Sequence, residues 1–361
     1  MLHLEDKRTV FLVLSPGFPA NEADTTCLPA QQSLIRSINK TYPFVHVIIL
    51  AFEYPYTTQS YQWFGNEVIP FGGRNKGGIH RLIRWIKIWF RLAQLNKKYR
   101  VSGILSFWLG QCALVGKYFA RINGLKQFTW ILGQDARKGN RYVRLIRPKP
   151  EELISLSDFI TKEFVRIYAI IPAKVIYIGI EPTLFPEILF NRDIDVLGVG
   201  ALIPLKQYDI FIEVVKNIKL KIPLLKAILC GSGKEQSTLQ KMIIEAGLED
   251  TVTLTGEMPH PEVLKLMNRS KILLHTSAYE GLGVVCLEAL YAGAHVISFC
   301  NPKDIWVRNW HIADNQVNMT QLAIEILQTP SLKHKPVLAY SMHDTTKAIM
   351  ELFNYSESAI S

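Results

Sequence analysis

The chain has 361 residues, of which 48% are hydrophobic and 20% are charged, a composition that fits about two globular domains and excludes a disordered or fibrous protein. It holds 41 Lys and Arg against 31 Asp and Glu, a formal net charge of +10. Residues 68–150 hold 18 basic residues and one acidic residue, Asp135, so this stretch carries +17 and the rest of the chain −7. Such a block predicts a polyanionic partner, either a membrane or a nucleic acid.

The first residues and the cysteines favour a cytosolic protein. The apolar segment at residues 9–15 is too short for a signal peptide, and Pro16 and Gly17 follow it at once. No window holds the roughly eighteen consecutive apolar residues that a membrane-spanning helix needs. The five cysteines are scattered and form no Cys-x-x-Cys pair, which is typical of reduced, buried thiols and argues against a metal site.

Short apolar, β-rich runs alternate with longer helical patterns along the chain. The runs predict strands at residues 10–14, 44–52, 103–107, 128–132, 175–178, 196–199, 226–229, 252–255, 272–275 and 295–299. Helices are predicted between them at residues 29–39, 79–98, 111–122, 208–218, 234–246, 261–268 and 284–291. Continuous apolar strands separated by helices indicate parallel sheets covered on both faces.

The pattern of strands and helices restarts after Pro182, so we expect an α/β protein of two Rossmann-like, doubly wound domains. The first would span residues 1–182 and the second residues 183–340. Residues 341–361 would form a C-terminal helix that crosses back to the first domain.

The predicted helix at residues 79–98 has two different faces. At about 100° per residue, one arc gathers apolar side chains that would face a core: Ile79, Leu82, Ile83, Ile86, Phe90 and Ala93. The opposite arc interleaves cations with apolar residues, which we assign to an anionic membrane surface: Arg81, Arg84, Trp85, Lys87, Ile88 and Arg91. A core helix with a solvated basic face is the competing interpretation. Nucleic acid is not the expected partner, because the sequence shows no zinc-finger spacing, RNP-type strand or helix-turn-helix.

The strongest chemical signal follows the predicted strand at residues 272–275. It reads Ser277-Ala278-Tyr279-Glu280-Gly281-Leu282-Gly283-Val284 and opens a helix that holds Glu288. Glycines at a strand-to-helix turn let a ligand approach the backbone, and the N–H groups at a helix start bind anions. Glu288 lies among apolar residues, so its carboxylate needs a partner, and a ribose diol would serve. An acidic helix cap with a solvated glutamate is the plainer interpretation.

This motif, Ser-x-x-Glu-Gly-x-Gly-x-x-x-Leu-Glu-Ala with Glu-x7-Glu spacing, resembles the family-4 retaining glycosyltransferases, which have the GT-B fold. Other segments resemble that family in the same order along the chain: Ser15-Pro16-Gly17-Phe18-Pro19, Ile178-Gly179-Ile180-Glu181, Val199-Gly200-Ala201-Leu202-Ile203-Pro204-Leu205-Lys206, Leu229-Cys230-Gly231-Ser232-Gly233 and Leu254-Thr255-Gly256. The resemblance implies two Rossmann-like domains that face each other across a cleft.

The resemblance also implies transfer of a sugar from a nucleotide-diphospho-sugar, with Lys206 neutralising the diphosphate and Glu280 near the sugar hydroxyls. A fixed cation suits this position because the leaving group gains negative charge. Glu288 would bind the ribose. The other donor-binding positions would be Gly17, Gly231, Gly233, Gly256, Gly281, Leu282, Gly283 and Val284. Asp135 would orient hydroxyls in the site, although a turn residue or an ion pair with a basic neighbour is the competing interpretation. No cofactor and no metal are expected.

The sequence departs from the family at three places. Ala201 stands where the family usually has an arginine, which removes a phosphate-binding cation unless Lys234 or Arg269 compensates. Gln134 stands where many members carry a histidine, and a glutamine exchanges no proton near neutral pH. Residues 301–309 replace the usual Gly-rich loop and its glutamate.

Three weaker signals are set aside. Asp193-Ile194-Asp195 matches the metal signature of the other main glycosyltransferase fold, but it precedes a strand instead of ending one, so we interpret it as chance. His260 is expected in a turn. His275 is expected at a strand end, from which it can approach the cleft.

We therefore expect a retaining transferase that moves a sugar to a glycan or lipid-linked acceptor in cell-surface polysaccharide or glycolipid synthesis. It would be cytoplasmic and held peripherally on the inner face of the plasma membrane by its basic first domain. Two alternatives stay open. One is a catalytically weak GT-B scaffold or partner subunit, motivated by Ala201, Gln134 and the altered loop at residues 301–309. The other is a sugar-nucleotide epimerase or a phosphorylase with the same fold, and an epimerase would release a new nucleotide-sugar without any acceptor.

Overall fold

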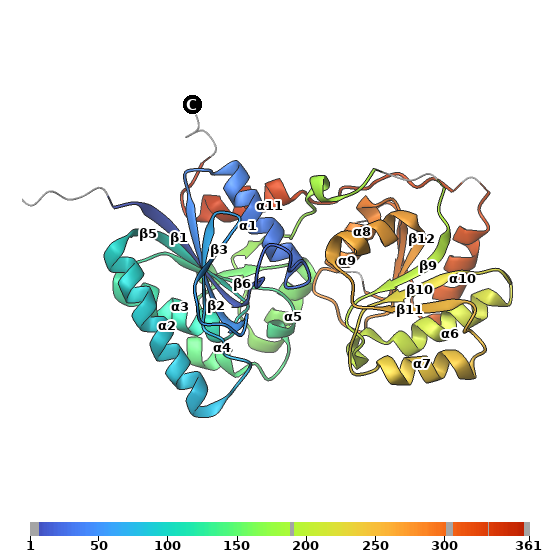
Figure 1. Ribbon diagram of the computed structural model, residues 1–361, viewed down its shortest axis with the longest axis horizontal. Coiled ribbons are helices and arrows are strands. Elements are labelled where there is room, and N and C mark those ends of the chain that lie inside the picture. The colour runs from blue at the N-terminus through green and yellow to red at the C-terminus, as the bar shows by residue number, and fades with distance from the viewer. Residues whose placement is uncertain (1–6, 188–190, 301–305, 331, 357–361) are drawn as a thin grey trace, which may run out of the picture. The chain divides into compact units, whose positions relative to one another are not determined.

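The computed structural model describes residues 7–187, 191–300, 306–330 and 332–356. The chain divides into two compact units: unit 1 comprises Met1–Ile178 and Met342–Ser361, and unit 2 comprises Gly179–Ser341. The C-terminal segment therefore belongs with the first unit and not with the second. Each unit is an α/β structure built on its own sheet (Figure 1).

The described sheet of unit 1 has the strand order β3-β4-β2-β1-β5-β6-β7-β8. Its neighbouring strands are parallel except for β3 and β4, which form an antiparallel edge. Residues 10–14 of β1 are all buried, because β1 lies inside the sheet and both sheet faces are covered. The strands are β1 (Thr9–Gly17), β2 (His46–Tyr54), β3 (Tyr61–Trp63), β4 (Asn66–Pro70), β5 (Arg100–Phe107), β6 (Gln127–Ile131), β7 (Leu153–Ser155) and β8 (Lys174–Val175).

Two pairs of helices cover the faces of this sheet. α2 (Gly78–Lys98) and α3 (Gln111–Asn123) pack on one face, where Ile88 and Phe119 share a hydrophobic core with Leu12 of β1. α1 (Pro29–Thr41) and α11 (Met342–Leu352) pack against each other. Phe353, directly after α11, contacts Phe11 of β1 edge to face, and Phe11 points to the side of the sheet opposite to Leu12. The remaining helices are α4 (Arg141–Ile146), α5 (Asp158–Tyr168) and the short 3-10 turns η1 (Gln134–Ala136) and η2 (Pro150–Glu152).

The described sheet of unit 2 is parallel throughout and has the order β11-β10-β9-β12-β13-β14. Its strands are β9 (Ile194–Val199), β10 (Ala227–Cys230), β11 (Val252–Gly256), β12 (Ser270–His275), β13 (His295–Ser298) and β14 (Trp310–Ile312). Its helices are α6 (Tyr208–Lys219), α7 (Gln236–Glu245), α8 (His260–Arg269), α9 (Val284–Tyr291) and α10 (Gln316–Leu327), with 3-10 turns η3 (Pro182–Leu184) and η4 (Pro204–Lys206). This is the doubly wound order of a Rossmann-like sheet.

The strand order fixes where a ligand can bind in unit 2. The sheet grows outward in both directions from β9 and β12, so the topology switches between these two strands. In doubly wound sheets, ligands bind beyond the carboxyl ends of the strands at such a switch point. Lys206 follows β9 and Glu280 follows β12, which places both residues at this edge of the sheet.

The orientation of α2 is opposite to the prediction. The arc expected in the core is exposed, with Ile79 and Phe90 at 64% and 65% exposure, whereas the buried residues of α2 include Arg84 and Ile88. Arg84 faces the sheet because Glu53, near the end of β2, is buried there, and a buried carboxylate needs a cation. The Nη2 of Arg84 lies 2.6 Å from Oε1 of Glu53.

This orientation corrects the assignment of residues to a membrane surface. Arg84 and Ile88 were assigned to that surface, but Arg84 is buried in its ion pair and Ile88 is 0% exposed in the core, so neither can contact lipid. The other four residues keep some exposure: Arg81, Trp85, Lys87 and Arg91.

Several short or peripheral elements were not predicted. They are β3, β4, β7 and β14 among the strands, and α4, α5 and α10 among the helices. The strand predicted at residues 175–178 is the two-residue β8, which begins one residue earlier. Of the departure at residues 301–309, the part at 301–305 lies outside the described residues. Within the described chain, every helix is too short or too polar to cross a bilayer.

Candidate functional site at the carboxyl edge of unit 2

Lys206 lies in the loop that leaves the carboxyl end of β9. It ends η4, a turn that begins with proline, whose fixed φ favours the first helical position. Thr276 donates a hydrogen bond from Oγ1 to the carbonyl oxygen of Lys206 at 2.7 Å, and the amide of Ala278 donates to the carbonyl of Leu205 at 3.1 Å. The loops on the two sides of the switch point therefore hold each other in place.

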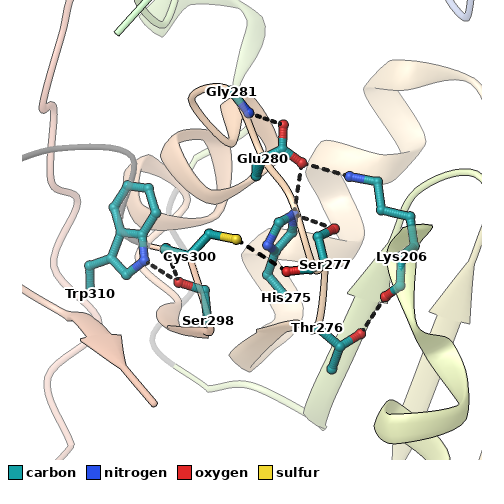
Figure 2. Close-up of polar contacts among 9 residues, drawn as sticks. All are labelled: Lys206, His275, Thr276, Ser277, Glu280, Gly281, Ser298, Cys300 and Trp310. Carbon is teal, nitrogen blue, oxygen red and sulfur yellow. Dashed lines mark hydrogen bonds and ion pairs between the residues drawn. The ribbon is translucent and has the colours of Figure 1, made fainter. Parts of the chain in front are cut away.

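One carboxylate oxygen of Glu280 lies close to both an ammonium group and an imidazole ring (Figure 2). Its Oε2 lies 2.7 Å from Nζ of Lys206 and 3.2 Å from Nε2 of His275. Its Oε1 accepts a hydrogen bond from the amide of Gly281 at 3.2 Å. The side chains of Lys206 and Glu280 are 19% and 22% exposed, so solvent and solutes can still reach this cluster.

The surroundings of Glu280 keep it ionised. Burial alone would raise its pKa, but the hydrogen bond from His275 and the charge of Lys206 outweigh burial and lower the pKa to about 2. Near neutral pH Glu280 is therefore a carboxylate that accepts hydrogen bonds, and it has no proton to donate. Such a group can orient hydroxyls and counter positive charge, but it does not act as a general acid.

Glu288 lies in α9 and has a protein partner. Its Oε1 lies 2.7 Å from Nε2 of His260, the first residue of α8, and both side chains are mostly buried at 14% and 16% exposure. The buried carboxylate therefore gains the hydrogen bond that it was expected to need from a ribose. The second carboxylate oxygen of Glu288 can still accept a hydrogen bond from a diol hydroxyl.

The structure requires glycine at some positions of the predicted donor site, and the reason differs from one position to the next. A Cβ on Gly231 would lie 1.9 Å from the carbonyl oxygen of Gly200, and a Cβ on Gly233 would lie 2.3 Å from the carbonyl oxygen of Leu202. These two positions exclude a side chain because neighbouring loops of unit 2 touch there. Gly283 has a φ of +69° at the residue before α9, where a left-handed backbone favours glycine. Gly256 likewise has a φ of +75°, although a Cβ there would meet open space, whereas a Cβ on Gly17 would meet only ordinary contacts.

The other two turn positions of the prediction differ in exposure. Leu282 is fully buried, so its side chain serves the core of unit 2. Val284 begins α9 and is partly exposed. At these two positions the turn can therefore offer backbone amides, but no polar side chain, to a ligand.

Asp135 in unit 1 organises a loop. Its carboxylate accepts hydrogen bonds from the amides of Leu109 at 2.7 Å, Gly133 at 2.9 Å and Leu132 at 3.1 Å. Burial raises its pKa to about 6 even though these amides favour the charged form. The geometry matches the competing interpretation of a turn residue, with backbone amides as partners in place of a cation. Gln134 beside it is exposed.

The two acids of Asp193-Ile194-Asp195 are already paired. Asp193 contacts Arg269 at 2.5 Å, and Asp195 contacts Lys271 at 2.7 Å. They stand at the amino end of β9, away from the edge that carries Lys206. Arg269 is thereby engaged elsewhere and does not replace the arginine missing at position 201. No group of three or more His, Cys, Asp or Glu side chains in the described chain is placed to hold a metal ion.

Sequence reasoning undervalued two histidines of this site. His275 is 4% exposed and its Nδ1 is buried without a hydrogen-bond partner among the described residues, so the ring is fixed mainly through Nε2. The signal for His275 was its place at the end of a strand that borders the switch point. The sequence signal for His260 was that the carboxylate of Glu288 needs a hydrogen-bond partner. In the structure, α8 packs against α9 and brings His260 to that carboxylate.

Residues 181–303 match the family model described as glycosyl transferases group 1, a segment that includes Lys206, Glu280 and Glu288. The poly(ribitol-phosphate) alpha-N-acetylglucosaminyltransferase of Staphylococcus aureus is 30% identical over 135 residues, which are 36% of this chain and 27% of that protein. A phosphatidylinositol N-acetylglucosaminyltransferase component from Arabidopsis thaliana is 26% identical over 191 residues, 49% of this chain and 43% of that protein. This chain thus spans less than half the length of these curated relatives.

Solved structures resemble nearly the whole chain. A sucrose-phosphate synthase from Thermosynechococcus elongatus aligns with a TM-score of 0.74 at 16% identity, covering 96% of this chain and 97% of that one. The Anabaena protein HepE, solved with UDP and glucose, aligns with a TM-score of 0.68 at 17% identity, covering 97% and 96%. The chain therefore has the GT-B fold of two Rossmann-like units, and its second unit carries the segment that matches the group 1 glycosyl transferases.

Proposed function

We propose that this chain is a retaining glycosyltransferase that moves a sugar from a nucleotide-diphospho-sugar to a glycan or lipid-linked acceptor. One observation carries the proposal: Lys206, Glu280 and His275 meet at the switch point of a Rossmann-like sheet, inside the segment that matches the family model. The relatives in Staphylococcus and Arabidopsis are named for N-acetylglucosaminyl transfer, and HepE was solved with UDP, which supports a nucleotide-sugar donor.

Lys206 would stabilise the departing nucleoside diphosphate. Its ammonium lies 2.7 Å from the Glu280 carboxylate and its side chain is 19% exposed, so it can share its charge with a second anion. When the bond to the sugar breaks, negative charge grows on the diphosphate, and a cation already in place is worth more in the transition state than in the ground state. Lys206 would supply that cation.

Glu280 would position the donor sugar. A carboxylate that accepts hydrogen bonds can hold sugar hydroxyls, and the bond from His275 limits the directions in which the Glu280 side chain can point. The backbone amides at the start of α9 would face the phosphate region. In this scheme Glu288 and His260 bind the ribose, at the hydrogen-bonded pair described above.

The experiment that tests this proposal measures the rate of sugar transfer by the variants Lys206→Ala and Glu280→Ala. Each variant should lose roughly 100- to 1,000-fold in kcat, the usual cost of removing one preorganised electrostatic group. Lys216→Ala is the matched control, because Lys216 forms an exposed ion pair with Glu213 on α6, and its rate should not change. Unchanged rates in both site variants would overturn the site assignment.

Three further readouts define the reaction. A thermal-shift panel of nucleotide-sugars identifies the donor, since a bound ligand raises stability by mass action. The anomeric configuration of the product tests retention. Activity in excess chelator tests metal independence.

The missing arginine at position 201 and the exposed Gln134 favour one alternative, a catalytically weak subunit that still binds nucleotide. Calorimetric binding of a nucleotide-sugar without any turnover in the presence of acceptors would support it. Release of a new nucleotide-sugar without acceptor would instead indicate an epimerase.

A further inference from the structure

A surface of unit 1 carries exposed apolar side chains that the proposed reaction does not use. They lie on α2, α3 and α4, of which α3 contacts each of the other two helices, and they are 41–72% exposed: Ile79, Leu82, Ile83, Ile86 and Phe90 on α2, Tyr118 and Ile122 on α3, and Leu145 on α4. In Figure 1, α2 runs along the edge of unit 1. A gathering of large apolar side chains on a soluble surface marks an interaction site.

An apolar groove opens between α2 and α3. Its volume is about 420 Å³, and all of its lining residues are aliphatic or aromatic, among them Trp85, Trp89 and Phe90 of α2 and Leu114 and Tyr118 of α3. This volume lies in the range of roughly 300–1,000 Å³ typical of sites for small ligands. The groove offers no polar anchor apart from ring edges, so it suits a hydrocarbon chain.

A basic cavity of about 790 Å³ adjoins this groove, and Tyr118 lines both. Its cations are Lys117, Arg121, Lys126, Arg144, Arg147 and Lys149. Its two acids are already occupied, since Glu152 contacts Lys117 at 2.6 Å and Glu151 lies 3.9 Å from Lys149.

Three guanidinium groups of this cavity remain available. Arg121, Arg144 and Arg147 are exposed, and none has a side-chain partner in the part of the chain that the structure describes. Planar guanidinium groups bind phosphate oxygens in a bidentate manner, which a lysine ammonium does not do. The cavity is therefore suited to a phosphate group.

We propose that α2, α3 and α4 form a docking site for an anionic phospholipid bilayer, with an acyl chain in the groove and a headgroup phosphate against Arg121, Arg144 and Arg147. The charge of the cavity is complementary to an anionic headgroup, and the adjoining groove is complementary to the chain attached to it. A water-soluble polyanion would use the cavity and leave the groove and the apolar face of α2 unexplained. The proposal names the membrane partner of the proposed enzyme and rests on that function for its purpose, although the binding itself does not depend on turnover.

The apolar face of α2 would let this site insert into the membrane interface, which charged side chains alone would not do. Ile83 and Phe90 are 45% and 65% exposed on the side of the helix that faces away from the buried Ile88. An amphipathic helix with apolar side chains outward and cations beside them lies in the plane of the membrane interface. Lys87, exposed on the same helix, would reach the phosphate level.

The test is cosedimentation of the full chain with vesicles of phosphatidylcholine alone or of phosphatidylcholine mixed with phosphatidylglycerol. The wild-type chain should bind the mixed vesicles at least about tenfold more tightly than the neutral ones. Two double variants probe the two parts of the site: Ile83→Glu with Phe90→Glu, and Arg121→Glu with Arg144→Glu. Each should lower binding to the mixed vesicles by roughly tenfold or more.

Matched controls come from unit 2. Lys221→Glu with Lys241→Glu makes the same change in net charge on exposed side chains, and Leu224→Glu changes an apolar residue that is 89% exposed. These variants should bind within about twofold of the wild type, because their side chains lie outside the docking site. All substituted residues are exposed, and thermal unfolding of each variant confirms that the fold is intact.

Three outcomes would overturn the proposal: equal binding to both kinds of vesicle, equal losses in the controls, or binding that survives both double variants. Duplex DNA and inorganic phosphate are the competing ligands. If either binds the wild type tightly and binds the Ile83→Glu/Phe90→Glu variant equally well, while vesicles do not bind, the cavity serves a soluble anion. Calorimetry with the donor nucleotide on the same variants separates this failure from a failure of the proposed function, because donor binding at unit 2 should not change.

Discussion

Two ion pairs of similar length have opposite surroundings in this protein. In unit 1, Arg84 and Glu53 meet at 2.6 Å with side chains only 5% and 10% exposed. In unit 2, Lys206 and Glu280 meet at 2.7 Å with side chains 19% and 22% exposed. The difference in exposure separates a pair that fastens a helix from a pair that can exchange partners.

The hydrogen bonds around Glu53 complete the contrast. Its Oε1 also accepts from Nε2 of Gln111 at 2.5 Å, and its Oε2 accepts from the amide of Asn75 at 2.8 Å. A Cβ on Gly73 would lie 2.2 Å from Oε2, so no space is left for a ligand beside this carboxylate. Glu53 therefore joins β2, α2, α3 and the loop before α2 into one structural unit, whereas Glu280 holds its partners at a partly open edge.

The largest expected effect is on stability and distinguishes the two pairs directly. Arg84→Ala should lower the free energy of unfolding by about 3–5 kcal/mol, because it leaves a buried carboxylate without its cation. Lys206→Ala should lower it by about 1 kcal/mol or less, since the pair is partly solvated. Chemical denaturation measures both values. Equal losses in the free energy of unfolding would show that the two ion pairs do not differ in their structural role.

The next effect concerns pH. The pKa of Glu280 is lowered to about 2 in the folded chain from an ordinary value of 4.5, so its ionised form stabilises the fold. This contribution is fully present above pH 4.5 and is lost as the pH falls from 4.5 toward 2. It amounts to at most about 3 kcal/mol.

Glu280→Gln is the variant that measures this contribution. It should flatten the fall of stability with pH between 4.5 and 2, when denaturation midpoints are compared with those of the wild type. An equally steep fall in the variant would show that other carboxyls cause it. Donor turnover would not enter this measurement.

The smallest expected effect belongs to a third pair, His260 with Glu288. If this pair binds the ribose, His260→Ala should weaken donor binding by about tenfold, or about 1.4 kcal/mol, and His260→Gln should recover part of the loss through its amide donor. Calorimetry with a nucleotide-sugar measures both variants. Unaltered affinity in His260→Ala would assign the pair to the packing of α8 on α9 alone.

The apolar runs allowed much of the fold to be predicted, because a buried parallel strand needs a continuous apolar segment. The central strands of both units lie within a few residues of their predictions. The short edge strands β3 and β14 could not be found in this way, since three residues carry no periodicity. Helices α5 and α10 are long enough to carry a pattern and were missed.

The same reasoning located the Glu280 turn but not the orientation of α2. Both arcs of that helix are rich in apolar residues, so periodicity alone gives two solutions. Glu53 lies in β2 and is distant in sequence. Its buried carboxylate needs the cation of Arg84, and this need determines which arc of α2 faces the sheet. The partner of Glu288 was missed for a related reason, because His260 reaches that carboxylate only through the packing of α8 on α9. His275 ends the strand before the Glu280 turn, so its place near the site was predicted but its contact with Glu280 was not.

The contact between Gly231 and Gly200 has a consequence for how substitutions in unit 2 are interpreted. The Cβ of any residue at position 231 would overlap a carbonyl oxygen of the neighbouring loop at 1.9 Å. If substitutions of Gly231 abolish activity, the cause is therefore the close contact between two loops, and this holds for any donor. Intolerance at Lys206 should instead appear as lost turnover with little loss of stability, and that difference is the criterion by which a scan of this edge can separate residues that shape the site from residues that touch its ligand.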